Sequence, residues 1–270
     1  MDILKAIILG IVQGLTEFLP VSSSGHLVLL QKIFGIDAPG LFFDTMLHTG
    51  TLAAVFAALW KDIWAILKKI IQPLTGFLIL GTIPAVIAAL SFNNIIEHFF
   101  ETGQLLGFCF LITSALLITA EKLSKRGNIQ LKKTENMTWL DAVLIGVMQA
   151  AAIAPGISRS GATISGALFR KLDRDTAARF SFLLSIPAIL GAVVLQIKDI
   201  ITGGAAEIAA ESIGTAAIIT GTASAAIVGF FAVKLMLKII KEKSLYGFAV
   251  YTGALGLLVI IDQFVTRIVF

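Results

Sequence analysis

The chain has 270 residues, of which 57% are hydrophobic and 14% charged, with a mean hydropathy of +0.94 and a formal net charge of +4. A soluble domain carries about 25% charged residues, so this composition excludes an ordinary soluble protein and indicates an all-α polytopic membrane protein. Its modest positive charge, without a basic and aromatic patch, fits an anionic membrane surface and argues against a nucleic-acid partner.

A broken apolar segment opens the chain. Residues 3–31 are apolar except near their centre, and a membrane segment tolerates such a break only where protein or a cavity satisfies the freed backbone. We therefore predict a re-entrant helical hairpin, in which two half-helices flank a polar turn. Three unbroken runs follow, at 41–60, 74–92 and 104–120, and each is close to the roughly 20 residues that cross a bilayer.

The second half of the chain has the same order of elements. After a polar linker at about 123–138, a second broken segment covers 139–169. Three more apolar runs follow, at 176–197, 213–237 and 245–264. The pattern predicts a single membrane domain, 1–270, made of repeat 1 (1–122) and repeat 2 (139–270), each with one re-entrant hairpin and three transmembrane helices.

The two broken segments are similar in sequence as well as in position. At one offset the first matches the second at five positions, which pair Gly10, Gln13, Ser22, Ser24 and Gly25 with Gly146, Gln149, Ser158, Ser160 and Gly161. An odd number of spans in each half predicts that the repeats have inverted topology. Interrupted apolar segments at corresponding places in two halves point to a substrate site in a membrane protein.

The charges of the loops predict the orientation. Lysine and arginine mark cytoplasmic loops, and they gather in the segments 61–73, 121–138, 170–174 and 234–244. The segments 93–103 and 198–212 are acidic instead. This alternation predicts six spans with both termini outside, so the first hairpin enters from outside and the second from the cytoplasm.

The turn of the first hairpin carries ionisable and hydroxyl side chains. Gln13 and Glu17 are four residues apart and therefore share a helix face. A carboxylate at membrane depth costs about 2.5–3.5 kcal/mol, so a functional role is the default interpretation of Glu17. Pro20 ends the half-helix, and the N-cap-forming residues Ser22, Ser23 and Ser24, followed by His26, begin the next one. The simpler interpretation is a capped turn with a hydrogen-bonded interior histidine.

The turn of the second hairpin has Arg159 between Ser158 and Ser160. A guanidinium in an apolar hairpin needs an anionic partner, and it binds phosphate oxygens in a bidentate manner. Flanking serines and half-helix N-termini add donors, while Gly25 and Gly161 permit close backbone approach. The alternative is an internal salt bridge between Arg159 and Glu17 without any ligand.

Together these groups can bind a phosphate or cleave one. A serine could act as the nucleophile or the histidine as the base, with arginine and a divalent ion stabilising the transferred group. Asp44 and His48, four residues apart on the next span, could support the site or could hydrogen-bond between helices.

At these residues the chain resembles the bacterial undecaprenyl-diphosphate phosphatase family, also called bacitracin-resistance proteins, over nearly its full length. Two motifs carry the resemblance. One is a Glu/Gln-x-x-x-Glu element running into Pro-Val-Ser-Ser-x-Gly-His, from Gln13 to His26, and the other is Pro-Gly-x-Ser-Arg-Ser-x-x-Thr, from Pro155 to Thr163. Gln13 departs from the second glutamate common in the family, which puts any mechanism that needs two carboxylates in doubt.

The resemblance implies a hydrolase that converts the polyprenyl diphosphate lipid to its monophosphate and so recycles the cell-wall lipid carrier. It implies a multi-pass protein of the bacterial plasma membrane, an active site open to the outer face and a divalent cation, Mg²⁺ or Ca²⁺. Glu17, Ser23, His26 and Arg159 would be catalytic, and Glu17 and Gln13 would contact the metal. The phosphate-binding set would be Ser22, Ser24, Gly25, Ser158, Arg159, Ser160, Gly161 and Thr163. Whether Ser23 attacks phosphorus or His26 activates a water stays open.

Two other functions are compatible with the same residues. Inverted repeats with half-helices meeting at the midplane are also a transporter architecture, so a lipid-phosphate flippase is the main alternative. A dual role, with hydrolysis combined with lipid reorientation, is the other. Small residues at Gly221, Ala225 and Gly229 indicate close helix packing, either within one chain or in a homodimer.

Overall fold

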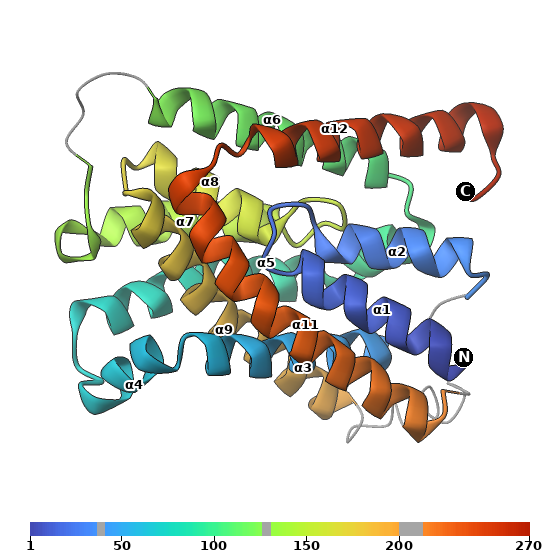
Figure 1. Cartoon of the computed structure of the whole chain (residues 1–270), viewed down its shortest axis with the longest axis horizontal. Helices are drawn as coiled ribbons and strands as arrows, with labels where there is room; N and C mark the ends of the chain where they lie inside the picture. The colour runs from blue at the N-terminus through green and yellow to red at the C-terminus, as the bar shows by residue number, and fades with distance from the viewer. Residues whose placement is uncertain (37–40, 126–130, 200–212) are drawn as a thin grey trace.

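The computed structural model describes residues 1–36, 41–125, 131–199 and 213–270, which form helices joined by short turns (Figure 1). The α-helices are α1 (Ile3–Thr16), α2 (Ser23–Ile33), α3 (Leu41–Ala58), α4 (Trp60–Lys68), α5 (Pro73–Thr102), α6 (Leu106–Ser124), α7 (Trp139–Ala151), α8 (Arg159–Phe169), α9 (Arg174–Asp199), α11 (Thr215–Glu242) and α12 (Tyr246–Ile261). Short helical turns lie at Thr134–Asn136 and Asp262–Thr266. Parts of the predicted linker 123–138 and of the acidic segment 198–212 lie outside the described residues.

The predicted spans correspond to long apolar helices. Among the described residues, five helices are long and apolar enough to cross a membrane: α5, α6, α9, α11 and α12. A sixth span results if α3 and α4 are taken together, although they are bent by 77° where they join. The chain is therefore an all-helical polytopic membrane protein with five or six candidate spans.

The two broken apolar segments each form a pair of short helices around a turn. Asp2 caps α1, and Ser22 caps α2 by accepting a hydrogen bond from the Gly25 N–H. In the second pair, Thr138 and Asp141 form a capping box at α7, and Ser158 caps α8. These caps satisfy N–H groups that have no partner within the helix, which explains why the serine-rich turns begin new helices.

The two helix pairs approach each other from opposite ends of the molecule, so that their turns meet near its middle (Figure 1). Helix α1 packs closely on α11, where a Cβ added at Gly10 would lie 2.2 Å from the Gly221 carbonyl oxygen. Helix α7 packs on α5 in the same manner, where a Cβ added at Gly146 would lie 2.4 Å from the Gly81 carbonyl oxygen. Each helix pair of one half of the chain is thus held against a long helix of the other half.

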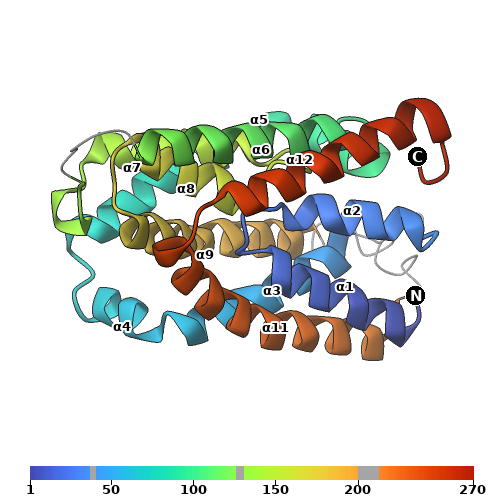
Figure 2. The ribbon, with the colours of Figure 1, turned by 45° about the horizontal axis from the view of Figure 1, so that its top comes forward.

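Helices α6 and α12 lie side by side along one face of the bundle in both views (Figure 2). Both termini lie at the same end of the long axis, and α4 and the C-terminal end of α6 lie at the other end (Figures 1 and 2). The main core cluster fills the space around the first turn, where Phe18 packs edge-on against Phe182 of α9. The turn is therefore embedded in the apolar interior rather than exposed at a surface.

Buried ion pairs fasten the end of the molecule that contains α4. Asp141 of α7 accepts hydrogen bonds from Lys132 at 2.9 Å and from Arg170 at 2.7 Å. Burial alone would raise the pKa of Asp141, but the hydrogen bonds from Lys132, Thr138 and Arg170 outweigh it and lower the pKa to about 2. Glu121 of α6 pairs with Arg174 of α9 at 2.6 Å. The Glu121–Arg174 pair connects the two halves of the chain, whereas the Asp141 pairs fix α7 to the linker and to the end of α8.

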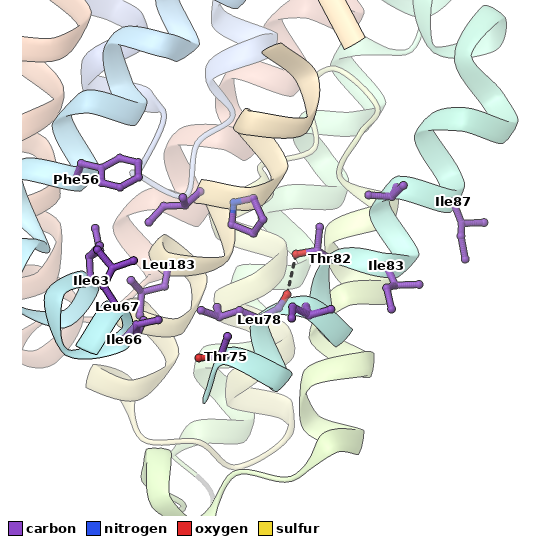
Figure 3. A pocket seen from close by; sticks show the side chains of 14 residues that line it. Phe56, Ile63, Ile66, Leu67, Thr75, Leu78, Thr82, Ile83, Ile87 and Leu183 are labelled. Atoms are coloured by element: carbon purple, nitrogen blue, oxygen red, sulfur yellow. Dashed lines mark hydrogen bonds between the residues drawn. The ribbon is translucent and has the colours of Figure 1, made fainter. Parts of the chain in front are cut away.

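An apolar groove of about 470 Å³ opens between α3, α4, α5 and α9 (Figure 3). Phe56, Ile63 and Leu67 line one side of it, and Leu78 and Ile83 line the other. Its walls consist almost entirely of aliphatic and aromatic side chains, as expected for a surface that faces lipid.

Candidate active site

The candidate active site is the place where the two turns meet. Arg159 begins α8, and its Nη2 atom donates a hydrogen bond to Oε1 of Glu17 at 2.5 Å. The side chains of Arg159 and Glu17 are only 17% and 3% exposed. Ser160 also crosses between the turns, because its hydroxyl donates to the Leu19 carbonyl oxygen at 2.8 Å. The structure therefore brings together the acid and the guanidinium that the sequence separates by more than half its length.

The second carboxylate oxygen of Glu17, Oε2, accepts hydrogen bonds from uncharged side chains. Oε2 accepts hydrogen bonds from the Ser23 hydroxyl at 2.5 Å and from the Gln13 amide Nε2 at 2.9 Å. Nε2 of His48, on α3, lies 3.6 Å from the same oxygen. A buried carboxylate needs such compensation, and here one cation and several polar hydrogens supply it.

Hydroxyls and helix N-termini surround this carboxylate–guanidinium pair. Ser22 caps α2 in an unusual backbone conformation, with a φ of 70°, and its hydroxyl lies 3.3 Å from that of Ser24. On the second turn, the Ser158 hydroxyl lies 3.2 Å from that of Ser160 and accepts from the Gly161 N–H at 3.0 Å. The N-termini of α2 and α8 thus converge on the same place, where partial positive charge favours an anion.

Two threonine hydroxyls hydrogen-bond the second turn and α8 to neighbouring helices. The Ser158 N–H donates to the Thr113 hydroxyl of α6 at 2.9 Å, and that hydroxyl donates in turn to the Gly156 carbonyl oxygen. Thr163 is fully buried, and its hydroxyl lies 2.6 Å from that of Ser181 on α9. Thr163 therefore ties α8 to its neighbour, and its direct contact with phosphate stays a prediction.

Glycine is required where the turns touch. A Cβ added at Gly25 would lie 2.6 Å from the Phe110 ring and 3.0 Å from the Cα of Gly156. Gly156 itself has a φ of 95°, which a residue with a side chain rarely adopts. Close approach at Gly25 thus serves the contact between the two turns.

His26 contacts a residue that we did not predict from the sequence. Its Nδ1 atom lies 2.6 Å from the Ser22 carbonyl oxygen, and its Nε2 atom lies 2.7 Å from the phenol oxygen of Tyr251 on α12. Tyr251 looks like an ordinary span residue in the sequence, and no spacing rule connects it to His26. Asp44 accepts a 2.8 Å hydrogen bond from Gln31 of α2, which is a contact between helices, whereas His48 lies beside Glu17 at the site.

The residues at the site offer hard oxygen ligands for a divalent cation. The carboxylate of Glu17 is one, and Oε1 of Gln13 is another, since it is buried and has no hydrogen-bond partner among the described residues. The described residues contain no group of three or more acidic, histidine or cysteine side chains that could hold a metal on its own. This donor set fits Mg²⁺ or Ca²⁺ held by one carboxylate, one amide and oxygens from phosphate or water.

Fold and site define a helical membrane protein with a buried, two-turn polar centre, and comparison with known proteins gives its family. Residues 6–258 match the family model described as bacitracin resistance protein BacA. A Bacillus cereus protein named undecaprenyl-diphosphatase 4 is 50% identical over 264 residues, covering 98% of each chain. Proteins named undecaprenyl-diphosphatase from Carboxydothermus hydrogenoformans and Halothermothrix orenii are 47% and 42% identical over 263 residues, covering 97% of this chain and 98% of each relative. The chain belongs to the BacA family.

Proposed function

We propose that this protein hydrolyses undecaprenyl diphosphate to undecaprenyl phosphate and inorganic phosphate in the plasma membrane, which recycles the cell-wall lipid carrier and confers bacitracin resistance. The names of the relatives support the substrate. The observation that carries the proposal is the contact of Arg159 with Glu17, and of Glu17 with Ser23, where two helix N-termini converge. This set combines an anion-binding group, a base and a nucleophile.

Substrate binding would exchange one anion for another at Arg159. In the free protein the guanidinium is paired with Glu17, and its Nη1 atom is buried without a hydrogen-bond partner among the described residues. A diphosphate offers oxygens for bidentate contact with the guanidinium. The N-termini of α2 and α8 and the hydroxyls of Ser24 and Ser158 would hold the remaining oxygens.

Ser23 is the nucleophile that the contacts support best. Its hydroxyl already donates to Glu17 at 2.5 Å, so Glu17 can take the proton as Ser23 Oγ bonds to the terminal phosphorus. The phosphoric anhydride bond breaks, and undecaprenyl phosphate leaves with the electron pair. Water then attacks the phosphorus of the phosphoserine, the bond from Ser23 Oγ to phosphorus breaks, Ser23 recovers its proton from Glu17, and inorganic phosphate leaves with both protons of the water. A His26-activated water is less well supported, because both ring nitrogens of His26 are engaged elsewhere.

A divalent cation at Glu17 and Gln13 would neutralise charge on the phosphate oxygens. Gln13 contributes in two ways: its Nε2 holds Glu17 in position, and its free Oε1 faces no competing donor among the described residues. In the arrangement we propose, the cation is therefore held with only one carboxylate, that of Glu17.

We also infer that the two halves are inverted repeats and that the site opens to the outer face. The matched contacts of Gly10 with Gly221 and of Gly146 with Gly81 support the repeat, because each hairpin packs on the equivalent helix of the other half. Location of both termini at one end supports an even number of crossings. Basic residues at the opposite end, such as Lys133 and Arg174, support placing that end in the cytoplasm.

Phosphate release in detergent tests the function. Purified protein with undecaprenyl diphosphate and Mg²⁺ should release inorganic phosphate, and Glu17→Gln and Arg159→Ala should each reduce the rate by about a hundredfold or more. Lys133→Ala, which removes an exposed cation far from the site, should have no effect. If the wild-type protein released no phosphate but moved labelled lipid across liposomes, the flippase function would replace our proposal.

A further inference from the structure

The hydrogen bonds of His26 determine its tautomer. A carbonyl oxygen can only accept, so the 2.6 Å contact with the Ser22 carbonyl requires the proton to be on Nδ1. In a neutral imidazole Nε2 is then the acceptor, and the phenol of Tyr251, at 2.7 Å, must be the donor. His26 therefore links the backbone of the first turn to α12 through its two nitrogens.

Aromatic contacts fix the same ring from two directions. The Tyr251 ring stacks on His26 at a centroid distance of 5.7 Å with only 9° between the planes. Phe110 meets His26 edge-on at 5.5 Å and 82°. His26 is 8% exposed, whereas Tyr251 is 48% exposed. The imidazole is therefore enclosed, and the phenol of Tyr251 covers its Nε2 atom.

The hydrogen bond from Nδ1 of His26 ends on Ser22, which has a strained backbone and precedes the proposed nucleophile, Ser23. The carbonyl that His26 holds belongs to Ser22, whose φ of 70° is rare for a residue with a side chain. The conformation of Ser22 sets the direction in which Ser23 leaves the turn, and Ser23 must meet Glu17 at 2.5 Å. A strained turn keeps its shape only if its surroundings hold it.

We propose that Tyr251 and His26 form a positioning pair that holds the first turn in its reactive shape. The phenol of Tyr251 fixes the tautomer and orientation of His26, and Nδ1–H of His26 fixes the Ser22 carbonyl. His26 then acts without gaining or losing a proton during the reaction, and Glu17 is the base. This inference rests on the proposed phosphatase function.

Substitutions that separate positioning from base catalysis test the pair. Asn can place an amide donor near the position of Nδ1 but cannot act as a base. His26→Asn should therefore keep phosphate release within about tenfold of wild type, whereas His26→Ala should lose about a hundredfold in kcat with little change in KM. If His26→Asn is as inactive as His26→Ala, a donor to the Ser22 carbonyl is not what His26 contributes, and the proposal is wrong.

The chain offers a matched control for Tyr251. Tyr246 is the only other tyrosine and begins the same helix. Tyr251→Phe keeps the stacked ring and removes the donor, so it should lower kcat by about tenfold, and Tyr246→Phe should not. Equal activity of Tyr251→Phe and wild type would overturn the pair.

A spectroscopic measurement separates the pair from the proposed function. The protein has three histidines, and the ¹⁵N signals of His26 are identified by their loss in His26→Asn. At neutral pH Nδ1 should be protonated and Nε2 should be a hydrogen-bonded acceptor whose signal shifts in Tyr251→Phe. A protonated Nε2 in the wild type would contradict the pair, even if the protein releases phosphate. If no phosphate is released, the proposed function fails and the ¹⁵N result still decides the pair.

Discussion

Gln13 has an amide nitrogen where a glutamate would have a second carboxylate oxygen, and this difference determines its role beside Glu17. Its Nε2 donates to Glu17 at 2.9 Å, so Gln13→Glu would place a second carboxylate against the first. Two carboxylates repel each other but bind a divalent cation more tightly. We expect Gln13→Glu to need about three- to tenfold less Mg²⁺ for half-maximal phosphate release, and to melt at a lower temperature than wild type in EDTA.

Gln149 provides the control, because it is the counterpart of Gln13 in the second hairpin and is equally buried. Gln149→Glu should lower the melting temperature without changing the Mg²⁺ requirement. An unchanged requirement in Gln13→Glu would exclude Gln13 from the metal site.

At the scale of elements, the fold depends on backbone approach between helices of opposite halves. Gly10→Ala would place a Cβ 2.2 Å from the Gly221 carbonyl oxygen, and Gly146→Ala would place one 2.4 Å from the Gly81 carbonyl oxygen. Such overpacking costs about 1–3 kcal/mol, so each variant should melt at a lower temperature in detergent. Gly191→Ala in α9 is the matched control, because a Cβ there meets no atom within 4 Å. Equal melting temperatures of Gly10→Ala and Gly191→Ala would show that the contact between α1 and α11 is looser than the structure describes.

At the scale of the whole molecule, orientation follows from charge. Cys109 is the only cysteine and is buried, so a Cys109→Ser background lets single cysteines report on each side. We expect an impermeant thiol reagent to label Glu101→Cys in intact cells and Lys133→Cys only after permeabilisation, because the basic end faces the cytoplasm. The reverse labelling pattern would place the site on the cytoplasmic side.

Much of this architecture can be predicted from the sequence. Composition alone excludes a soluble fold, because too few charged residues are available to cover a water-exposed surface. The polar breaks within the two apolar segments predict both helix pairs, and Pro20 and the capping serines of the first break act through the local backbone. Glu17 and Arg159 stand out because an ionisable residue at membrane depth is costly unless it has a partner.

Other features depend on tertiary packing. The sequence offered the Glu17–Arg159 pair as one of two interpretations, but only the folded chain places α1 against α11 and brings Tyr251 to His26, a residue 225 positions away. The folded chain also shows that a helix, α4, bent by 77° from α3, occupies most of the segment 61–73 that the sequence predicted as a loop. The physical reason is the distance in sequence over which each signal acts. Helix caps, helix breaks and hydropathy depend on neighbouring residues. Which helices and side chains meet depends instead on whether surfaces far apart in the sequence are complementary in shape and charge.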